Sequence, residues 1–260
     1  MASVQPVRAD VIVDIPALQG ATLFGASPTS NNSSSGPGVF VGADGMGNPK
    51  RALIQFDIPA FVPANATITS ASLSLVLGQG PAATPRRERS ASLISRHRGR
   101  AARMAEPDLE APGGFAPNPG DVTWNFAKYD TVPWTTPGGG GDFVSTESAA
   151  AVVGQDLNTA YIWGSTARTV SDVQGWLDGT LPNFGWLLRN DSETSPTTFR
   201  AFYTRDGAIE QRVPQFAPEL IVSFVTPAAV PEPAAIVLLG SALVGFRVLR
   251  RRGTSTTVAF

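Results

Sequence analysis

Apolar and small polar residues alternate in short stretches along most of the chain. The clearest stretch covers residues 66–77, where Leu73, Leu75 and Leu77 are separated by Ser and Val, and Ser and Thr precede them. This is the pattern of a strand with one face buried. Comparable apolar or alternating runs predict further strands at residues 11–15, 38–42, 52–58, 184–188, 197–203 and 219–225.

One segment has helical spacing instead. Val170, Val173 and Leu177 fall on one helical face with Trp176, and Gly179 follows as a stop signal. The pattern predicts one short helix over about residues 169–178. Many short strands with turn-rich joints, together with this helix, predict an all-β fold of the jelly-roll-like β-sandwich type.

Composition agrees with many turns and excludes several kinds of site. The 260 residues include 26 Gly and 22 Pro, no Cys and a single His, His97. The absence of Cys excludes disulfides, thiol catalysis and Cys-ligated metals. One isolated His disfavours Ser-His-Asp triads and His-rich metal sites. No cofactor is expected, apart from calcium at the oxygen-rich loops described below.

Charge is distributed unevenly. Residues 86–103 contain seven Arg and one acid, and residues 234–260 contain four Arg and no acid. The rest of the chain has 9 basic and 20 acidic residues. A body this acidic repels phosphate backbones, so no nucleic-acid partner is expected for it.

The C-terminal stretch has the pattern of a membrane anchor. Residues 234–249 are apolar up to Arg247, and Arg250, Arg251 and Arg252 follow. We expect residues 234–249 to form a short transmembrane helix, with residues 250–260 as a basic cytoplasmic tail, by the positive-inside rule. A buried core helix is the alternative, and the absence of a polar stripe disfavours it.

A sorting motif precedes this helix. Val230, Pro231, Glu232 and Pro233 lie in a Pro-rich linker, residues 226–233, and the order of motif, helix and Arg cluster resembles the PEP-CTERM sorting signal. The resemblance implies recognition by an exosortase, a membrane cysteine protease-transpeptidase, with the inner membrane as a transient partner. It further implies export to the cell surface or extracellular matrix of a bacterium.

The N-terminus bears on the same expectation of export. Residues 1–20 contain no apolar signal-peptide core, although Val7 and Ala9 fit a signal-peptidase site. We interpret residues 1–9 as a candidate remnant of a signal peptide whose start codon lies further upstream. An in-frame stop codon immediately upstream would contradict this interpretation.

The body has a resemblance of its own. Several segments are similar to DNRLRE-domain proteins: residues 51–58, 68–75, 173–176, 183–188, 202–205 and 218–222. For residues 10–225 the resemblance implies a β-jelly roll of bacterial surface proteins. It also implies carbohydrate binding, with acidic polysaccharides among the ligands, and brings no catalytic residues.

Four aromatic residues are candidates for stacking on sugar rings. Trp124, Trp134, Tyr161 and Trp163 lie near Gly, Thr and Pro, although packing in the core is the stronger expectation for them. Trp176 and Trp186 are expected in the core. Arg51 either holds a ligand or, with more weight, pairs with Asp57 or another carboxylate.

Oxygen-rich loops are the candidates for calcium. They contain Asp44 with Asn48, Asp142, and the group Asn190, Asp191 and Glu193. None has the ligand spacing of an EF-hand, so we expect loops rather than metal sites. Gly138–Gly141 is expected to be a flexible turn and not a phosphate-binding loop.

Residues 84–113 differ from the rest of the body. They are Arg-rich, show no strand alternation, and lack the strand that DNRLRE-like sequences have at this place. Three interpretations remain: a basic arm for an anionic polymer, a solvated insertion, or a segment between two compensating frameshifts. Reading the gene in its other frames tests the third, because a frameshift predicts an alternating apolar segment there.

Two classes of function remain. The favoured one is an exported surface or matrix protein with a non-catalytic β-sandwich that binds polysaccharide. The alternative is a polysaccharide lyase or hydrolase, which needs a base and a charge-stabilising group that one His and three Tyr supply poorly. Release of unsaturated products or reducing ends would favour the enzyme.

Overall fold

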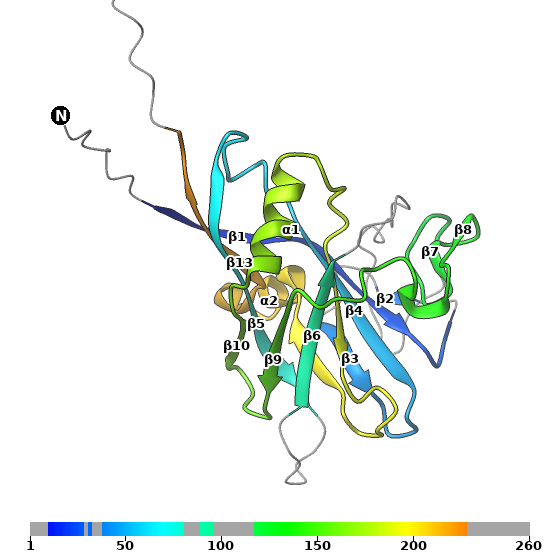
Figure 1. Ribbon diagram of the computed structural model, residues 1–260. Coiled ribbons are helices and arrows are strands. Elements are labelled where there is room, and N and C mark those ends of the chain that lie inside the picture. The colour runs from blue at the N-terminus through cyan, green and yellow to red at the C-terminus, as the bar shows by residue number, and fades with distance from the viewer. Residues whose placement is uncertain (1–9, 29–30, 33–37, 81–88, 96–116, 228–260) are drawn as a thin grey trace, which may run out of the picture. The chain divides into compact units, whose positions relative to one another are not determined.

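The computed structural model describes residues 10–28, 31–32, 38–80, 89–95 and 117–227 (Figure 1). The chain divides into two units, residues 1–226 and 227–260. Within the described ranges, no helix has the length and apolarity to cross a bilayer. The predicted membrane helix at residues 234–249 lies outside these ranges, as do the N-terminal residues 1–9 and the basic tail at residues 250–260.

The described chain is mostly β. Its strands are β1 (Val11–Phe24), β2 (Asn31–Asn32), β3 (Gly38–Ala43), β4 (Pro49–Phe56), β5 (Thr67–Gln79), β6 (Arg89–Ser95), β7 (Phe126–Lys128), β8 (Val132–Pro133), β9 (Ala149–Val153), β10 (Ala160–Trp163), β11 (Trp186–Asn190), β12 (Arg200–Tyr203) and β13 (Glu219–Val225). The α-helices are α1 (Ala167–Leu177) and α2 (Arg205–Glu210), and the 3₁₀ turns are η1 (Pro137–Gly139) and η2 (Pro214–Phe216).

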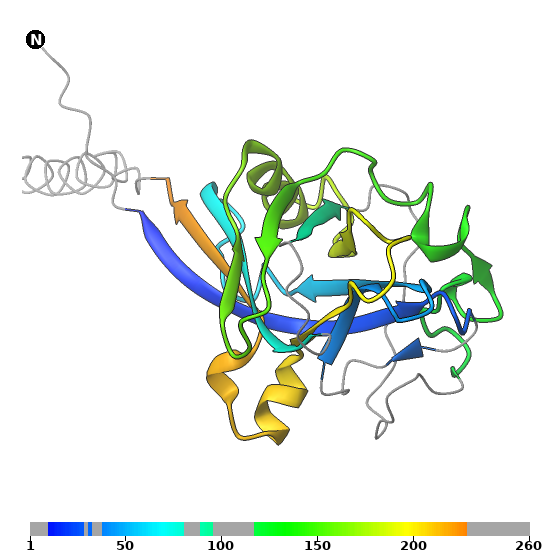
Figure 2. The same ribbon diagram turned by 90° about the horizontal axis from the view of Figure 1, so that it is seen from below.

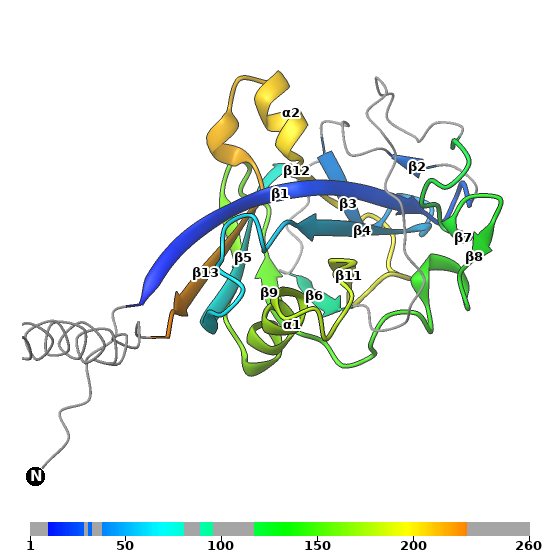
Figure 3. The same ribbon diagram turned by 90° about the horizontal axis from the view of Figure 1, so that it is seen from above.

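Six antiparallel strands form a closed ring in the order β1, β13, β5, β12, β3, β4 and back to β1. Strand β1 closes it by pairing with β13 through its first half, Val11–Pro16, and with β4 through its second half. Figure 3 shows β1 as a long curved strand that runs from its pairing with β13 to its pairing with β4. The ring satisfies backbone hydrogen bonds that an open sheet edge would leave unpaired.

Four further strands extend from the ring. Strand β10 pairs with β5, while β11 pairs with β4, then β6 with β11, and β9 with β6. Apolar residues of β9, β10 and β11 join those of the ring in one core, which includes Phe56, Trp163, Trp186 and Phe202. The rings of Trp163 and Phe202 lie 5.7 Å apart, and those of Phe56 and Trp186 lie 6.3 Å apart, so aromatic contacts connect the extra strands to the ring.

The end of β1, the middle of β4 and the start of β11 are buried on both faces. Trp186 and Leu188 face the main core, whereas Leu187 between them joins a second cluster with Leu23 and Leu53. The segment from Val122 to Phe143 covers this second cluster. Burial on both faces explains why residues 186–188 are a continuous apolar run rather than an alternating one.

The predicted helix is present as α1. Thr166 caps it by accepting hydrogen bonds from the amides of Arg168 and Thr169, and the Thr169 hydroxyl accepts a return bond from the Thr166 amide. The expectation of one helix was wrong, because Thr204 caps a second short helix, α2. Figures 2 and 3 show α1 and α2 on opposite sides of the strands.

The expectation that residues 84–113 contain no strand was also wrong. Strand β6 forms within them and hydrogen bonds to β11 on one edge and to β9 on the other. Without β6, the facing edges of β11 and β9 would each leave backbone N–H and C=O groups unpaired, and β6 supplies hydrogen-bond partners to both edges. The remainder of the segment, residues 84–88 and 96–113, lies outside the described residues, so the three interpretations of its origin stay predictions.

A buried carboxylate links α1 to the strands. Asp172 is 1% exposed, and its Oδ2 accepts hydrogen bonds from the Ser148 hydroxyl at 2.5 Å and from the Trp186 indole at 3.1 Å. Arg168 lies 3.6 Å from its Oδ1. The Trp186 ring in turn lies 4.7 Å from that of Trp176 on the same helix. Asp172 therefore fixes the position of α1 against β11 and the start of β9.

Asp172→Ala should lower the free energy of unfolding by about 3 kcal/mol, because it leaves the buried donors of Ser148 and Trp186 without an acceptor. Asp178→Ala, at the exposed end of the same helix, serves as the control and should cost less than about 1 kcal/mol. Urea denaturation of both variants measures the difference. Equal losses would contradict the role assigned to Asp172.

Asp14 on β1 and Glu219 on β13 are acidic residues that lie close together where these two strands pair. Burial, followed by the negative charge of Asp14, raises the pKa of Glu219. Its ionised form is therefore less favourable in the folded chain than in the unfolded one. Protonated Glu219 therefore contributes to the free energy of unfolding at low pH, and this contribution is lost as the pH rises through the pKa of Glu219 in the folded chain.

Glu219→Gln should raise the melting temperature modestly at neutral pH, because it removes the unfavourable charge. The gain should shrink as the pH falls and Glu219 becomes protonated in the parent protein. Glu210→Gln, at an exposed position of α2, is the control. Melting curves from pH 3 to 8 would contradict the assignment if the gain did not depend on pH.

Candidate functional site

The four aromatic residues predicted to stack on sugars lie in two separate places. Trp124 and Trp134 belong to the second apolar cluster, while Tyr161 and Trp163 lie on β10. Trp163 is 0% exposed and Trp134 is 4% exposed. The Trp134 indole donates to the Thr123 carbonyl at 2.8 Å. Neither buried ring offers a face to a sugar, so packing in the core, the stronger expectation, describes these two residues.

Trp124 and Tyr161 are half-buried. The Tyr161 hydroxyl accepts a hydrogen bond from the Asp156 amide at 3.3 Å, and its ring packs against the main core. Trp124 packs on the second cluster, and the Arg51 guanidinium lies over its ring, with the guanidinium carbon 5.1 Å from the ring centroid. The structure therefore does not join the four aromatic residues into one stacking surface.

Arg51 is at the centre of a satisfied polar cluster. Its Nε and Nη2 each donate to a carboxylate oxygen of Glu193 at 2.7 Å, and its Nη1 donates to the Gly138 carbonyl at 2.6 Å. The expectation that Arg51 pairs with a carboxylate is confirmed, and the partner is Glu193 rather than Asp57. All three guanidinium nitrogens donate hydrogen bonds, so Arg51 links strand β4 to the loop that contains Gly138 and to the loop that contains Glu193.

The turn at Gly138–Gly141 packs against this cluster. Gly138 has φ +78°, and a Cβ there would lie 2.8 Å from the Trp124 ring and 2.9 Å from Arg51 Nη1. Only glycine combines this left-handed conformation with such close approach. The turn that the sequence predicted is thus an ordered part of the cover over the second cluster.

The oxygen-rich loops use their oxygens for hydrogen bonds within the chain. Asp44 Oδ1 accepts from the amides of Met46 and Asn48, both at 2.9 Å, which closes the loop between β3 and β4. Asp142 Oδ2 accepts from the Thr135 amide at 2.6 Å, and Asn190 Oδ1 accepts from the Ser192 amide at 2.7 Å. Across the described residues, no group of three or more His, Cys, Asp or Glu has the arrangement of a metal site.

Charges beside Asp44 influence its ionisation. Burial by itself raises the pKa of Asp44, but hydrogen bonds from Asn48 and Met46 and the charge of Lys50 outweigh it, so that the pKa is lowered overall. Lys50 is half-buried, and burial lowers its pKa against the opposing effect of Asp44. The Lys50 ammonium lies 5.4–5.8 Å from the ring centroids of Phe24, Phe40 and Phe199. This cation–π cluster joins β1, β3 and β4 and was not predicted, because its rings are far apart in sequence.

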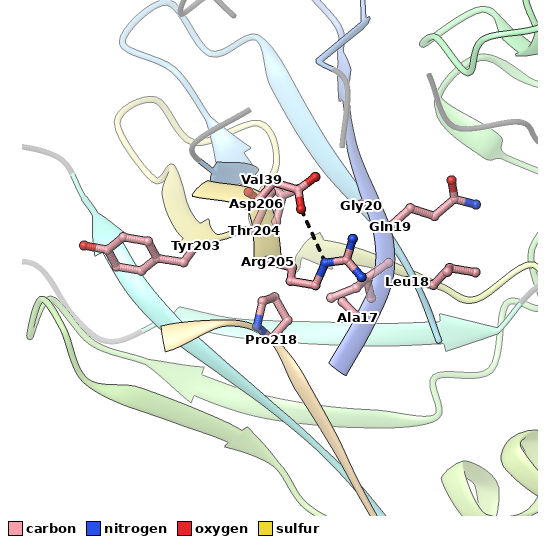
Figure 4. Close-up of a pocket in the computed structure, with 11 residues that line it drawn as sticks. Ala17, Leu18, Gln19, Gly20, Val39, Tyr203, Thr204, Arg205, Asp206 and Pro218 are labelled. Atoms are coloured by element: carbon pink, nitrogen blue, oxygen red, sulfur yellow. Dashed lines mark hydrogen bonds and ion pairs between the residues drawn. The ribbon is translucent and has the colours of Figure 1, made fainter. Parts of the chain in front are cut away.

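A small hollow lies where β1 meets the start of α2. Figure 4 shows its lining, which includes the ion pair between Arg205 and Asp206. Arg205 Nε lies 3.3 Å from Asp206 Oδ1, and the two side chains are 44% and 36% exposed. The hollow has a volume of about 10 Å³, which is room for roughly one water molecule and too little for a larger ligand.

The comparison with protein families concerns the end of the chain. Residues 229–252 match the PEP-CTERM protein-sorting motif. The chain therefore carries a PEP-CTERM signal. Such a signal implies processing by exosortase, a membrane enzyme, and sorting to the cell surface or extracellular space. Among curated proteins, no sequence matches the chain.

The matched residues include every element predicted for sorting. Val230, Pro231, Glu232 and Pro233 lie at its start, and Arg250, Arg251 and Arg252 at its end. The prediction of a PEP-CTERM signal is confirmed. These residues lie outside the described part of the chain.

A double-mutant cycle on Arg51→Met and Glu193→Gln should give a coupling energy of about 1–2 kcal/mol, because the side chains are only 17% and 18% exposed and the contact is bidentate. The matched control is the cycle on Arg205→Met and Asp206→Asn, an exposed pair that should couple weakly. Chemical denaturation of the parent, the four single variants and the two double variants supplies the seven unfolding free energies. Similar coupling in both cycles would contradict the linking role of Arg51.

Proposed function

We propose that this chain is an exported bacterial surface or matrix protein, sorted by exosortase, whose non-catalytic β body binds extracellular polysaccharide. The observation that carries the proposal is the match of residues 229–252 to the sorting motif. The body is taken to be a DNRLRE-like jelly roll on the similarity of its segments to that family. Exosortase and, transiently, the inner membrane are the partners during sorting.

The position of the sorting signal favours a body that stays folded during processing. The last strand, β13, ends at Val225, before the Pro-Glu-Pro residues begin at Pro231. Strand β13 is paired on both edges, with β1 and with β5. Cleavage near Pro231–Pro233 therefore removes no residue from the ring and leaves the core intact.

The buried carboxylates support a non-catalytic role. Asp121, Asp142 and Asp172 are each at most 3% exposed, and each accepts hydrogen bonds from donors of the chain itself. Glu193 is held in two hydrogen bonds by Arg51. A glycosidase needs a pair of carboxyl groups that face a substrate, whereas these four are used in holding loops and helix to the strands.

Sorting is tested with a tag fused behind Phe260. In cells that make exosortase, the parent chain, expressed from its own gene with the upstream sequence in place, should lose the tag and its body should reach the surface. Pro231→Ala with Glu232→Gln should keep the tag and remain in the membrane fraction, as should the parent chain in cells without exosortase. Pro227→Ala, in the same linker but outside the matched residues, is the control and should behave as the parent. Full-length protein in the cytosol of every strain would contradict the proposal.

Polysaccharide binding is tested separately on the purified full chain. We expect it to sediment with extracellular polysaccharide from exosortase-containing bacteria and to release neither reducing ends nor unsaturated sugars. Product release would favour the lyase or hydrolase alternative. Absence of sedimentation would remove the polysaccharide partner and leave the sorting result unaffected.

A further inference from the structure

A groove runs along the outer side of β12 and its neighbours. It has a volume of about 300 Å³ and is lined by Gly38, Phe40, Gly78, Gln79, Ala201, Phe202, Tyr203 and Gln211. The volume is at the small end of the range for small-ligand sites, about 300–1,000 Å³. None of the aromatic residues singled out from the sequence contributes to it.

The strand register produces this groove. Strand β12 lies between β3 and β5, with Ala201 opposite Phe40 and Tyr203 opposite Gly38. Because side chains alternate across a strand, Phe202 and Val39 enter the core, and the neighbouring positions face outward. The groove is deepest between the rings of Phe40 and Tyr203, because the residues there have small side chains or none: Gly38, Gly78 and Ala201.

Tyr203 is held in place from several sides. Its hydroxyl donates to Asn158 Oδ1 at 3.1 Å, and its ring centroid lies 5.4 Å from that of Phe216. A Cβ at Gly78 would lie 2.9 Å from the ring, so the glycine allows the ring to lie directly against β5. A ring fixed before binding loses little conformational entropy when a ligand stacks on it.

The lining has the chemistry of a site for neutral sugars. Aromatic faces attract the weakly positive C–H groups of a pyranose, and Gln79 and Gln211 are exposed amides that both donate to and accept from hydroxyl groups. None of the described residues that line the groove is charged, and the Lys50 ammonium lies 5.4 Å from the Phe40 ring centroid. The chain outside its two Arg-rich segments carries 20 acidic and 9 basic residues, which repels polyuronates.

We propose that this groove binds a segment of a neutral glycan, with Phe40 and Tyr203 against the sugar rings and Gln79 and Gln211 on the hydroxyl groups. The proposal rests on the polysaccharide-binding function proposed above and names its site and ligand class. It differs from the acidic polysaccharides that the DNRLRE resemblance implies, because none of the described residues that line the groove carries a positive charge to hold a carboxylate.

The test is calorimetric titration of the full chain with neutral oligosaccharides (cellohexaose, xylohexaose and mannohexaose) and with oligogalacturonate, each at low and high salt. At least one neutral probe should bind, with an affinity that salt changes less than twofold, since no charge pair forms. Tyr203→Ala should weaken binding at least tenfold, and Gln211→Ala severalfold. Gln215→Ala, an exposed glutamine of η2 that does not line the groove, is the matched control and should bind as the parent.

Each other outcome overturns the proposal in a distinct way. Binding that persists in the Tyr203 and Gln211 variants but is lost in Trp124→Ala would place the site elsewhere and leave the proposed function standing. Salt-sensitive binding of oligogalacturonate alone would refute the neutral ligand class. Absence of binding to every probe would refute the groove, while the sorting experiment would still decide export. If Tyr203→Ala fails to fold, Tyr203→Phe and the exposed-site variants Gln79→Ala and Gln211→Ala decide the question.

Discussion

The closure of the ring depends on a single irregularity in β1. Between Ala17 and Gln19 the pairing of β1 with β4 shifts by one residue, and Leu18 is left exposed. Because side chains alternate along a strand, one extra residue exchanges the two faces. Ile15 and Ala17 enter the main core before this point, while Ala21 and Leu23 enter the second cluster after it. The bulge thus lets one strand serve both cores.

The need to cover the second cluster explains the polar contacts of Arg51, Trp134 and Asp142. Covering Leu23, Leu53 and Leu187 requires the long segment from Val122 to Phe143, which has little regular structure of its own. Such a segment must satisfy its backbone groups with side chains. Trp134 and Asp142 accordingly bond to nearby backbone atoms, and Arg51 fixes the turn at Gly138. These contacts hold the covering segment in place.

Strands with one buried and one exposed face could be predicted from the sequence, because their apolar and polar residues alternate. Residues 66–77 and 219–225 alternate, and the structure forms β5 and β13 there. The sequence could not predict the second half of β1, because the bulge reverses the alternation at Leu18. Strands β9 and β10 were missed as well, since Ala150, Val152 and Ile162 are exposed apolar residues that hide the period. Strand β6 has a neighbour on each edge, and such pairing leaves no trace in local sequence.

The two kinds of candidate site differ in how far sequence alone determines them. The sorting signal is defined by its residue types, their order and their spacing, so Val230–Pro233 could be identified without a fold. A groove is made by residues that only the strand register brings together, such as Phe40 with Ala201 and Tyr203 with Gly38. Each of those residues is unremarkable in its own segment. The aromatic residues that stood out near Gly and Pro were instead those needed to fill the cores, because large rings are the most effective way to bury apolar area at an irregular turn.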